Sequence, residues 1–385
     1  MQFNNTPIYL DNNSTTQVDQ RVIEEMLPFL TVNYFNPNSS SGLGKKIKCI
    51  VEDSRRIIAD IINAEPSEIT FTSGSTESIN IALKGFINNN NIKGKHIVTV
   101  KTEHSAVLET CKYLESVGFE VTYLDVQNDG LISLEDLEKS IRPDTFLICV
   151  MYVNNETGVI QPINQIAEIA HSHGAYFMCD TTQAFGKLNI NVVELNIDIL
   201  CISGHKIHAP KGIGVLYLNK KVKATHLIPN LHGGKQESGL RSGTLNVPGI
   251  IALAKACEIS QKEMKQNEEH ISRLRNLLEI ELLKTLNTNI NGNSRSRIFN
   301  VSNICFKGID ANILIGKLQN IAISNGSACN SLIFQPSHVL SAMGLSDDEA
   351  MSSIRFSIGK YNTENEIKDA IEILKYNINL LTTYA

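Results

Sequence analysis

The chain has 385 residues, of which 42% are hydrophobic, so it is long enough for one large core or for two domains that share an interface. Its net charge of −5 argues against bulk binding to nucleic acid or to a membrane surface. It has no N-terminal apolar leader and no run of about 18 apolar residues. These features predict a soluble, cytoplasmic protein with no membrane partner.

The expected elements begin with short apolar runs that alternate with amphipathic segments from about residue 66 to 220. The expected strands are Ile69–Thr72, His96–Val100, Glu120–Leu124, Thr145–Val153, Tyr176–Asp180, Ile197–Ser203 and Gly214–Leu218. The expected helices include Glu77–Phe86, Ser105–Ser116, Leu134–Ser140 and Ile163–His173. This alternation predicts an α/β fold with a mostly parallel sheet that is covered on both faces. Ligands of such sheets bind at the carboxyl ends of the strands.

A second region begins near residue 255. A long charged helix pattern runs from about Ile251 to Leu286, and a mixture of short elements follows it. The expected strands there are Ile298–Cys305 and Ile321–Ser324, and the expected helices are Ala311–Leu318, His338–Ala342 and Glu364–Leu381. This mixture predicts a smaller α+β domain.

The eight cysteines are scattered, without a C-x-x-C pair or the ligand spacing of a zinc site, so no metal is expected. Cys149, Cys179 and Cys201 lie within apolar runs, where cysteine behaves as a small buried hydrophobe. Cys329 differs, because it lies in the small polar stretch Ser324–Ser331, which is typical of a loop. A reducing, cytoplasmic setting fits this pattern.

One lysine, Lys206, follows the expected strand Ile197–Ser203 within the sequence Ser-Gly-His-Lys. A lysine at a strand end, flanked by side chains that bind anions, suits a covalent bond to an aldehyde cofactor that carries a phosphate. An ordinary surface lysine after a strand is the alternative. Thr72–Ser78 also follows a strand and opens a helix, where free N–H groups could bind phosphate. An ordinary capping box that includes Glu77 explains this stretch equally well.

Three further polar positions follow expected strands. His104 could stack on a flat ring or move a proton, or could begin a helix at the surface. Asn155 could donate to a ring oxygen or belong to an Asn-rich turn. Asp180, with Gln183 three residues later, could pair with a protonated pyridine nitrogen, because a buried carboxylate needs such a partner, or could cap a helix.

Together and in this order, these features resemble the group I cysteine desulfurases of the NifS/IscS type. These enzymes belong to the class-V aminotransferase family of fold type I pyridoxal-phosphate enzymes. The resemblance covers essentially the whole chain. Its most specific motifs are Lys101–His104, Val153–Glu156, Ser203–Gly214, His232–Gly234, Arg241–Thr244 and Gly326–Cys329. It implies a large cofactor-binding domain over 15–255 with a seven-stranded sheet. It also implies a small domain, made of 1–14 and 256–385, that carries the catalytic-cysteine loop.

The resemblance implies that pyridoxal 5′-phosphate is bound covalently by Lys206, which then moves the substrate Cα proton. His104 stacks on the ring and takes part in proton transfer, and Asp180 pairs with the ring nitrogen. Gln183 and Asn155 contact the ring hydroxyl. The phosphate contacts that it implies are Ser75, Thr76, Ser203, His205 and, from the neighbouring subunit of a homodimer, Thr244.

The substrate implied by the resemblance is L-cysteine, whose carboxylate is bound by Arg355 and Asn155. Cys329 then attacks the substrate sulfur, which leaves a persulfide on Cys329 and releases L-alanine. An unreactive loop cysteine is the interpretation without the resemblance. The long loop and the interval from Cys329 to Arg355 match the group I enzymes.

Three departures bear on the sulfur acceptor and on the ring contacts. The sequence after Asp180 has Thr181 where the family usually has alanine, and the loop over 330–335 is more apolar than is typical. The chain also ends just after its last helix, at Ala385, whereas longer relatives carry a tail that helps to dock the iron–sulfur scaffold. We therefore expect an acceptor from iron–sulfur assembly, tRNA thiolation or DNA phosphorothioation.

Two other functions compete with desulfuration. The first is a selenocysteine lyase or another lyase or aminotransferase of the same fold, and the second is a non-catalytic sulfur-transfer scaffold. The presence of Lys206, Asp180 and Cys329 argues against the scaffold.

Overall fold

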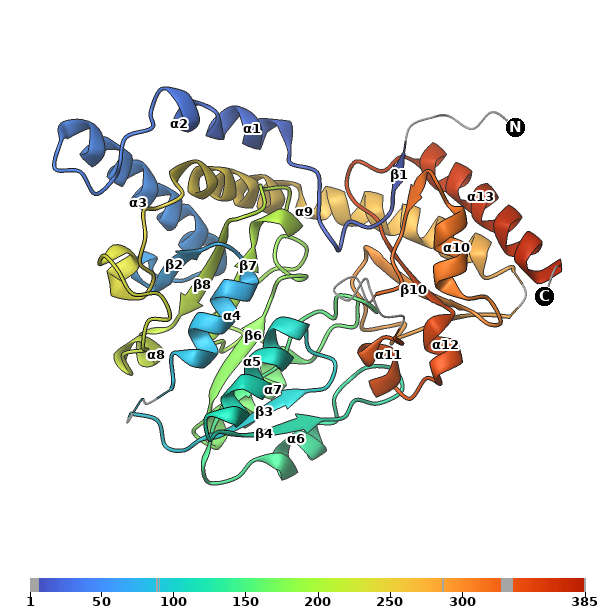
Figure 1. Ribbon diagram of the computed structural model, residues 1–385, viewed down its shortest axis with the longest axis horizontal. Coiled ribbons are helices and arrows are strands. Elements are labelled where there is room, and N and C mark those ends of the chain that lie inside the picture. Colours follow the sequence, from blue (N-terminus) through green and yellow to red (C-terminus); the bar gives the residue numbers. More distant parts are fainter. Residues whose placement is uncertain (1–6, 88, 90, 286, 327–334, 384–385) are drawn as a thin grey trace.

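The computed structural model describes residues 7–87, 89, 91–285, 287–326 and 335–383 (Figure 1). Its central feature is a seven-stranded sheet in the order β2-β8-β7-β6-β5-β3-β4. β8 is antiparallel to both of its neighbours, whereas β3 to β7 are parallel. The predicted α/β fold with a mostly parallel sheet is confirmed. The strands are β2 (Ile69–Thr72), β3 (His96–Val100), β4 (Glu120–Leu124), β5 (Thr145–Cys149), β6 (Tyr176–Asp180), β7 (Ile199–Ser203) and β8 (Gly214–Leu218).

Helices cover both faces of this sheet because its inner strands are apolar on both sides. In β6, for example, Phe177 packs into one buried cluster with α3, α7 and α9, while Met178 packs into another with α4 and α5. The helices of this part are α1 (Gln20–Met26), α2 (Pro28–Thr31), α3 (Gly42–Ile62), α4 (Ser75–Lys84), α5 (Ser105–Ser116), α6 (Leu134–Ser140), α7 (Ile163–Ser172) and α8 (Lys220–Ala224). Three short 3₁₀ helices are η1 (Pro66–Glu68), η2 (Gly204–Lys206) and η3 (Gln236–Gly239).

A smaller part contains two small sheets. β12 (Ser353–Ser357), β10 (Val301–Phe306) and β9 (Thr288–Ile290) form an antiparallel sheet, and β1 (Ile8–Tyr9) pairs in parallel with β11 (Ile321–Ala322). Its helices are α10 (Ala311–Lys317), α11 (His338–Ala342), α12 (Asp347–Met351) and α13 (Glu364–Thr383). The long helix α9 (Val247–Leu282) runs from the large part into the smaller one, where it packs against α13 (Figure 1). The predicted domain boundaries stay predictions.

Most predicted elements occur within a few residues of their expected bounds, and the differences have local causes. α9 begins at Val247 rather than near Ile251, because Asn246 caps it and Pro248 occupies its first turn. β5 ends at Cys149, because Val153 instead pairs with Ile160 across a turn. The helices α1, α2, α3, α8 and α12 and the short strands β1 and β9 were not predicted.

The three cysteines that were predicted to be buried lie in the core of the large part. Cys149, Cys179 and Cys201 are completely buried, and burial holds the pKa of each thiol well above its ordinary value, so they are inert packing residues.

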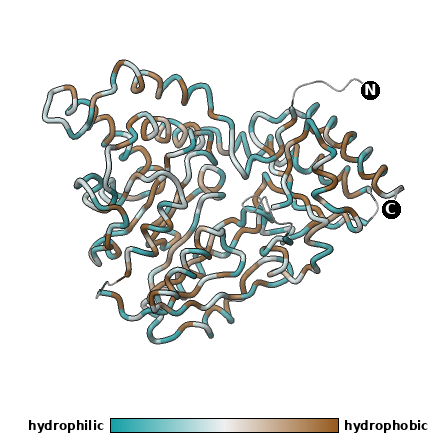
Figure 2. Tube along the Cα trace, in the orientation of Figure 1, coloured by the Kyte–Doolittle hydropathy of each residue, from teal (hydrophilic) through white to brown (hydrophobic). Residues whose placement is uncertain are grey.

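Hydrophobic and hydrophilic residues alternate along the outer helices (Figure 2). Within the described ranges, no helix combines the length and the apolar character that a membrane span requires.

Candidate active site

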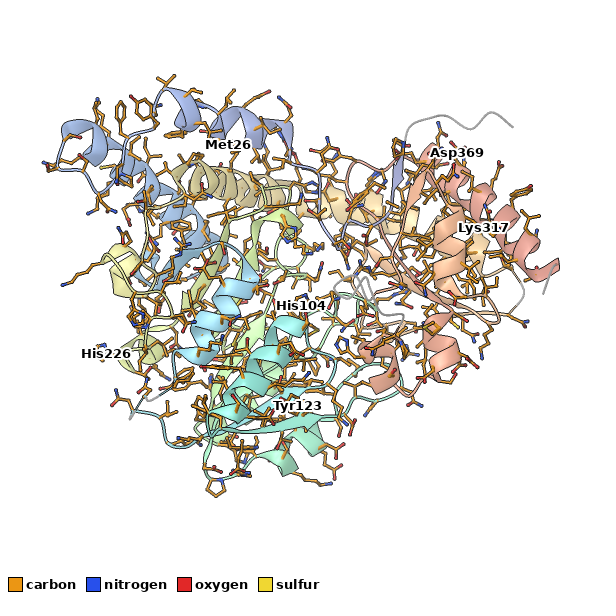
Figure 3. All side chains as sticks on the ribbon, viewed as in Figure 1. Met26, His104, Tyr123, His226, Lys317 and Asp369 are labelled. Atoms are coloured by element: carbon orange, nitrogen blue, oxygen red, sulfur yellow. The ribbon has the colours of Figure 1, made fainter. Side chains whose placement is uncertain are left out.

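The carboxyl ends of several strands of the large sheet face the smaller part across a cavity of about 630 Å³. Ten of the predicted site residues line this cavity: Ser75, Thr76, His104, Asn155, Asp180, Gln183, Ser203, His205, Lys206 and Arg355. Figure 3 shows His104 near the middle of the molecule, at the start of α5. Thr244 is exposed and is absent from the cavity lining, and Cys329 lies outside the described residues.

One end of the cavity combines hydroxyl groups with the start of α4. The N-cap of α4 is Gly74, which has φ of 151° and no side chain that could satisfy the free N–H groups of the first turn. A Cβ at Gly74 would lie 3.5 Å from the Ser203 hydroxyl, so β7 ends directly beside this turn. Ser75 Oγ and Thr182 Oγ1 are 2.6 Å apart. Free N–H groups, hydroxyls and the helix dipole together form a place for an anion.

Asp180, at the end of β6, provides a nearly buried carboxylate in the middle of the cavity. Its Oδ1 accepts hydrogen bonds from the Thr182 N–H at 2.9 Å and from the Thr182 hydroxyl at 2.5 Å, which fixes its orientation. The unusual Thr181 causes no conflict, because its hydroxyl donates to the Cys201 carbonyl oxygen at 2.8 Å.

The Gln183 amide is also held in one orientation. Its Nε2 donates to the Asn13 carbonyl oxygen at 3.0 Å, and its Oε1 accepts from Lys187 Nζ at 3.2 Å. Burial and the nearby Lys206 lower the pKa of Lys187 to about 7. The amide therefore presents its nitrogen side to the N-terminal segment.

His104 caps α5, and its Nδ1 accepts the Ala106 N–H at 3.1 Å. Its Nε2 therefore carries the proton of the neutral ring. Burial lowers the pKa of His104, and Lys206 acts in the same direction while Asp180 opposes it. The imidazole is thus neutral, fixed in orientation, and able to donate a proton from Nε2.

Lys206 ends the 3₁₀ turn η2, directly after β7. Its Nζ donates to the carbonyl oxygens of Asn13 at 2.5 Å and Ser14 at 2.7 Å. The neighbouring His205 Nδ1 lies 3.1 Å from the Thr15 hydroxyl. Burial and the charges of Lys206 and Lys211 lower the pKa of His205 to about 4, so this ring is neutral near pH 7.

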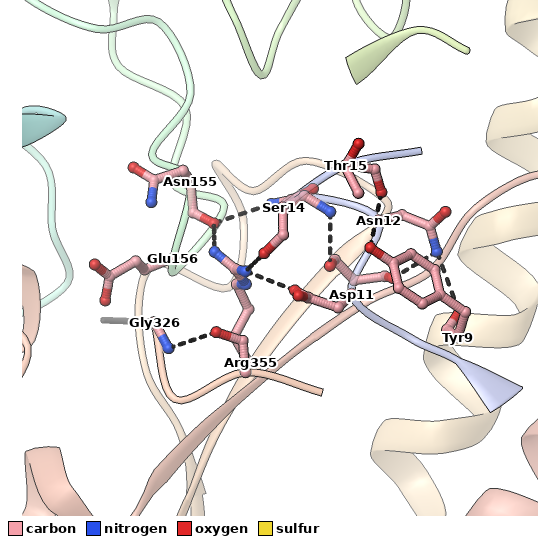
Figure 4. A network of polar contacts seen from close by, with 12 residues as sticks. Tyr9, Asp11, Asn12, Ser14, Thr15, Asn155, Glu156, Gly326 and Arg355 are labelled. Atoms are coloured by element: carbon pink, nitrogen blue, oxygen red, sulfur yellow. Dashed lines mark hydrogen bonds and ion pairs between the residues drawn. The ribbon is translucent and has the colours of Figure 1, made fainter. Parts of the chain in front are cut away.

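The opposite side of the cavity is dominated by Arg355 of β12, whose side chain is only 3% exposed (Figure 4). Its Nη2 donates to Asp11 Oδ1 at 2.6 Å and to Ser14 Oγ at 2.8 Å, and its Nη1 donates to the Asn155 carbonyl oxygen at 3.1 Å. Its buried Nε has no hydrogen-bond partner among the described residues. Some donor capacity of this guanidinium therefore remains for a carboxylate in the cavity.

The sequence analysis gave no role to Glu156, Ser337 and His338, which also line the cavity. Ser337 Oγ donates to Glu156 Oε2 at 2.5 Å, and His338 Nε2 lies 3.0 Å from the Glu103 carbonyl oxygen. Burial raises the pKa of Glu156, while Ser337, His338 and Arg355 oppose the shift. Glu156 belongs to the motif Val153–Glu156, so the sequence offered a signal for it. Ser337 and His338 only begin a short helix and belong to no recognisable sequence pattern.

The arrangement can bind a flat ring that carries an anionic group and an aldehyde. The start of α4 suits the anion, Asp180 suits a protonated ring nitrogen, and the Lys206 amine suits the aldehyde. Arg355, on the opposite side, suits the carboxylate of an amino acid.

Comparisons with known proteins agree with this chemistry. The family pattern of the class-V aminotransferases matches residues 8–369. Cysteine desulfurase IscS of Ehrlichia chaffeensis is 46% identical over 379 residues, which cover 98% of this chain and 92% of that protein. The solved structure of a NifS-like protein has a TM-score of 0.90 and 38% identity, and covers 98% of this chain and 100% of its own. The solved structure of SspA in complex with cysteine has a TM-score of 0.82 and 38% identity, and it covers 92% of this chain and 100% of its own. The chain therefore belongs to the cysteine desulfurases of the class-V aminotransferase family.

Proposed function

We propose that this cavity converts L-cysteine to L-alanine with pyridoxal 5′-phosphate bound to Lys206, and that the sulfur leaves as a persulfide on Cys329. The observation that carries the proposal is the convergence of Lys206, Asp180, His104 and Arg355 on one cavity. Enzymes of this family use this cofactor. The structure of the related SspA was solved in complex with cysteine, which supports L-cysteine as the substrate.

The described residues fit each part of the cofactor. The first turn of α4, with Ser75, Thr76, Ser203 and the neutral His205, would bind the phosphate. Asp180 would pair with the ring nitrogen and His104 would lie against the ring. Gln183 and Asn155 would contact the ring hydroxyl. When bound, the cofactor withdraws electrons from the bonds at the substrate Cα.

The chain itself supplies binding and proton transfer. Arg355, which already contacts the Asn155 carbonyl oxygen, binds the substrate carboxylate together with Asn155. The Lys206 amine accepts the Cα proton, and His104 donates a proton from Nε2. The Cys329 thiolate attacks the substrate sulfur, because the thiolate is the nucleophilic form of cysteine.

We further propose a cytoplasmic homodimer that delivers its sulfur to an acceptor protein. Thr244 is exposed and off the cavity, which is compatible with a phosphate contact to the neighbouring subunit. The acceptor belongs to iron–sulfur assembly, to tRNA thiolation or to DNA phosphorothioation. No direct contact with nucleic acid is proposed.

The proposal is tested with the purified holoprotein and L-cysteine, by measuring L-alanine, sulfide and the persulfide on tryptic peptides. We expect alanine in the native protein and no persulfide in Cys329→Ser, with the cofactor absorbance retained in both. Cys49→Ser removes an exposed thiol and should leave the activity unchanged. Native holoprotein that forms no alanine would overturn the proposal.

A further inference from the structure

We propose that Lys187 is a positioning residue, which holds the amide of Gln183 from behind so that an amide N–H faces the ring hydroxyl of the cofactor. The inference rests on the proposed function, in which Gln183 contacts that hydroxyl. Lys187 does not belong to the lining of the active-site cavity, so it acts only through Gln183.

The ammonium of Lys187 is directed at a single residue. Its Nζ donates to the Gln183 carbonyl oxygen at 3.0 Å and to Gln183 Oε1 at 3.2 Å. The side chain is partly buried, yet it forms no ion pair with a carboxylate of the described ranges. Removing an ammonium from water without a carboxylate partner is costly, and such arrangements are typical of functional sites. The contact with Gln183 therefore needs a functional reason.

The two ends of the Gln183 amide have partners that agree on one orientation. An ammonium only donates hydrogen bonds, so the atom that faces Lys187 must be Oε1. A carbonyl oxygen only accepts them, so the atom that faces Asn13 O at 3.0 Å must be Nε2. Nε2 carries a second N–H, and Gln183 lines the active-site cavity. Because Lys187 engages the amide oxygen, the amide offers this N–H to the ring hydroxyl.

The backbone brings Lys187 to this place. Gln183 and Lys187 are four residues apart in a turn of helical hydrogen bonds after β6, and residues with this spacing face each other. Gly186 has a positive φ of 75°, and a Cβ there would lie only 2.7 Å from Ile207 Cγ2. Ile207 directly follows Lys206, so this turn packs closely against the segment that holds Lys206.

Lys206 shares a hydrogen-bond acceptor with the amide. The Asn13 carbonyl oxygen accepts from Gln183 Nε2 at 3.0 Å and from Lys206 Nζ at 2.5 Å. Lys187, the amide, this carbonyl and Lys206 thus form one continuous chain of contacts. The charge of Lys206 contributes to the lowered pKa of Lys187, which shows that the two ammonium groups interact. The charge of Lys187 and the N–H that it orients both favour the ionised form of the ring hydroxyl.

The groups around Lys187 do not replace its charge. Lys187, Lys206, His208 and Lys360 line a second cavity of about 50 Å³, which has no carboxylate among its described lining residues. Lys360 is paired with Asp19 at 2.5 Å, and His208 is neutral near pH 7 because its pKa is about 4. The titratable groups of the ring site itself are His104, Asp180, His205 and Lys206.

The experiment titrates the visible absorbance of the bound cofactor in the holoprotein, from about pH 6 to about pH 10. Lys187→Met removes both the donor to Oε1 and the charge. We expect the midpoint of this titration to rise by about one to two pH units, because a hydrogen bond to an ionised oxygen is worth about that much. Lys187→Arg keeps the donor and the charge and should restore the native midpoint. The control Lys221→Met changes an exposed lysine of α8 and should match the native protein.

A second readout measures the dissociation constant of the cofactor with the apoprotein at pH 7. We expect binding to Lys187→Met to weaken about 10-fold, with a thermal unfolding midpoint of the apoprotein close to that of the native chain. Lys187→Gln can still donate to Gln183 Oε1 but carries no charge. It should shift the absorbance midpoint in the same direction by a smaller amount, and it carries the test if Lys187→Met fails to fold.

The outcomes separate this inference from the proposed function. If Lys187→Met and Lys187→Gln titrate like the native holoprotein, only the role of Lys187 fails, and alanine formation by the native protein still supports the proposed function. Equal shifts in Lys187→Met and Lys187→Arg would indicate that the filled space matters rather than the donor, and would overturn the inference. Lower thermal stability with an unchanged midpoint would indicate a purely structural role and would overturn it as well. Native holoprotein that forms no alanine would instead overturn the proposed function.

Discussion

The cofactor side and the substrate side of the cavity are built in different ways. On the cofactor side, Asp180 ends one strand of the large sheet and is held by Thr182, two residues later. On the substrate side, Arg355 contacts Asn155 and Asp11, which are 200 and 344 positions away in the chain. The contact that orients Asp180 lies within one sheet, whereas the contacts of Arg355 depend on how the N-terminal segment and the two parts meet. We therefore expect substitutions on the first side to change the chemistry and those on the second to change substrate binding.

The largest effect is expected on the cofactor side, for Asp180→Asn. The amide can still accept the Thr182 hydrogen bonds but cannot stabilise a protonated ring nitrogen. We expect kcat for alanine formation to fall about 10²- to 10³-fold while the cofactor absorbance is retained. The control is Asp125→Asn, whose side chain is 75% exposed and which should behave as the native protein. A change in KM without a change in kcat would break the comparison between the two sides.

The two sides also differ in how far the sequence predicts them. Ser75, His104, Asp180 and Lys206 each lie at or just after the end of an apolar strand, and parallel strands bring their carboxyl ends to one edge. Residue type and position were therefore enough to predict that these side chains meet. Arg355 was assigned only through the family resemblance.

The remaining contacts of the substrate side carry no local signal. His338 meets the Glu103 carbonyl 235 positions away, and that acceptor is a backbone atom, so no residue type marks it. The pairing of Asp11 with Arg355 likewise depends on β1 joining β11, a two-residue strand pair with no periodic pattern. The large sheet was predictable because its strands are mostly apolar and alternate with helices, whereas this junction rests on single polar contacts.

A smaller effect is expected on the substrate side, for Arg355→Lys. Lysine keeps the charge but loses the planar fork that holds Asp11, Ser14 and a carboxylate at the same time. We expect KM for L-cysteine to rise about 10- to 100-fold, with a smaller change in kcat, because the lost contact serves binding. The control Arg273→Lys alters a side chain that is 57% exposed. If kcat fell while KM stayed constant, Arg355 would belong with the cofactor side.

His208 lies where the turn after Lys206 contacts the N-terminal segment and the smaller part, and we expect it to make this junction sensitive to acid. It follows Lys206 in the same turn, and its Nδ1 donates to the Gln17 carbonyl oxygen at 2.8 Å. Its ring packs edge-on against Tyr361, with 5.3 Å between the ring centroids. Burial and the charge of Lys360 lower the pKa of His208 to about 4.

The smallest effect is therefore a pH dependence of stability. An unfolded histidine titrates near pH 6.5, so the unfolded chain binds more protons than the folded one between pH 6.5 and 4. The contribution of a neutral His208 to the free energy of unfolding is present above pH 6.5 and is lost as the pH falls from 6.5 to 4. In His208→Asn, Nδ2 can replace the donor to Gln17, and asparagine tolerates the positive φ of 68°. Between pH 7 and pH 5, the native protein should lose about 1 to 2 kcal/mol more unfolding free energy than this variant, as measured by urea titration. The matched control is His226→Asn, which also has a positive φ, of 58°, but is exposed and should keep the native acid sensitivity. If His208→Asn lost as much stability in acid as the native protein, His208 would not be the group that links the protonation of this junction to folding.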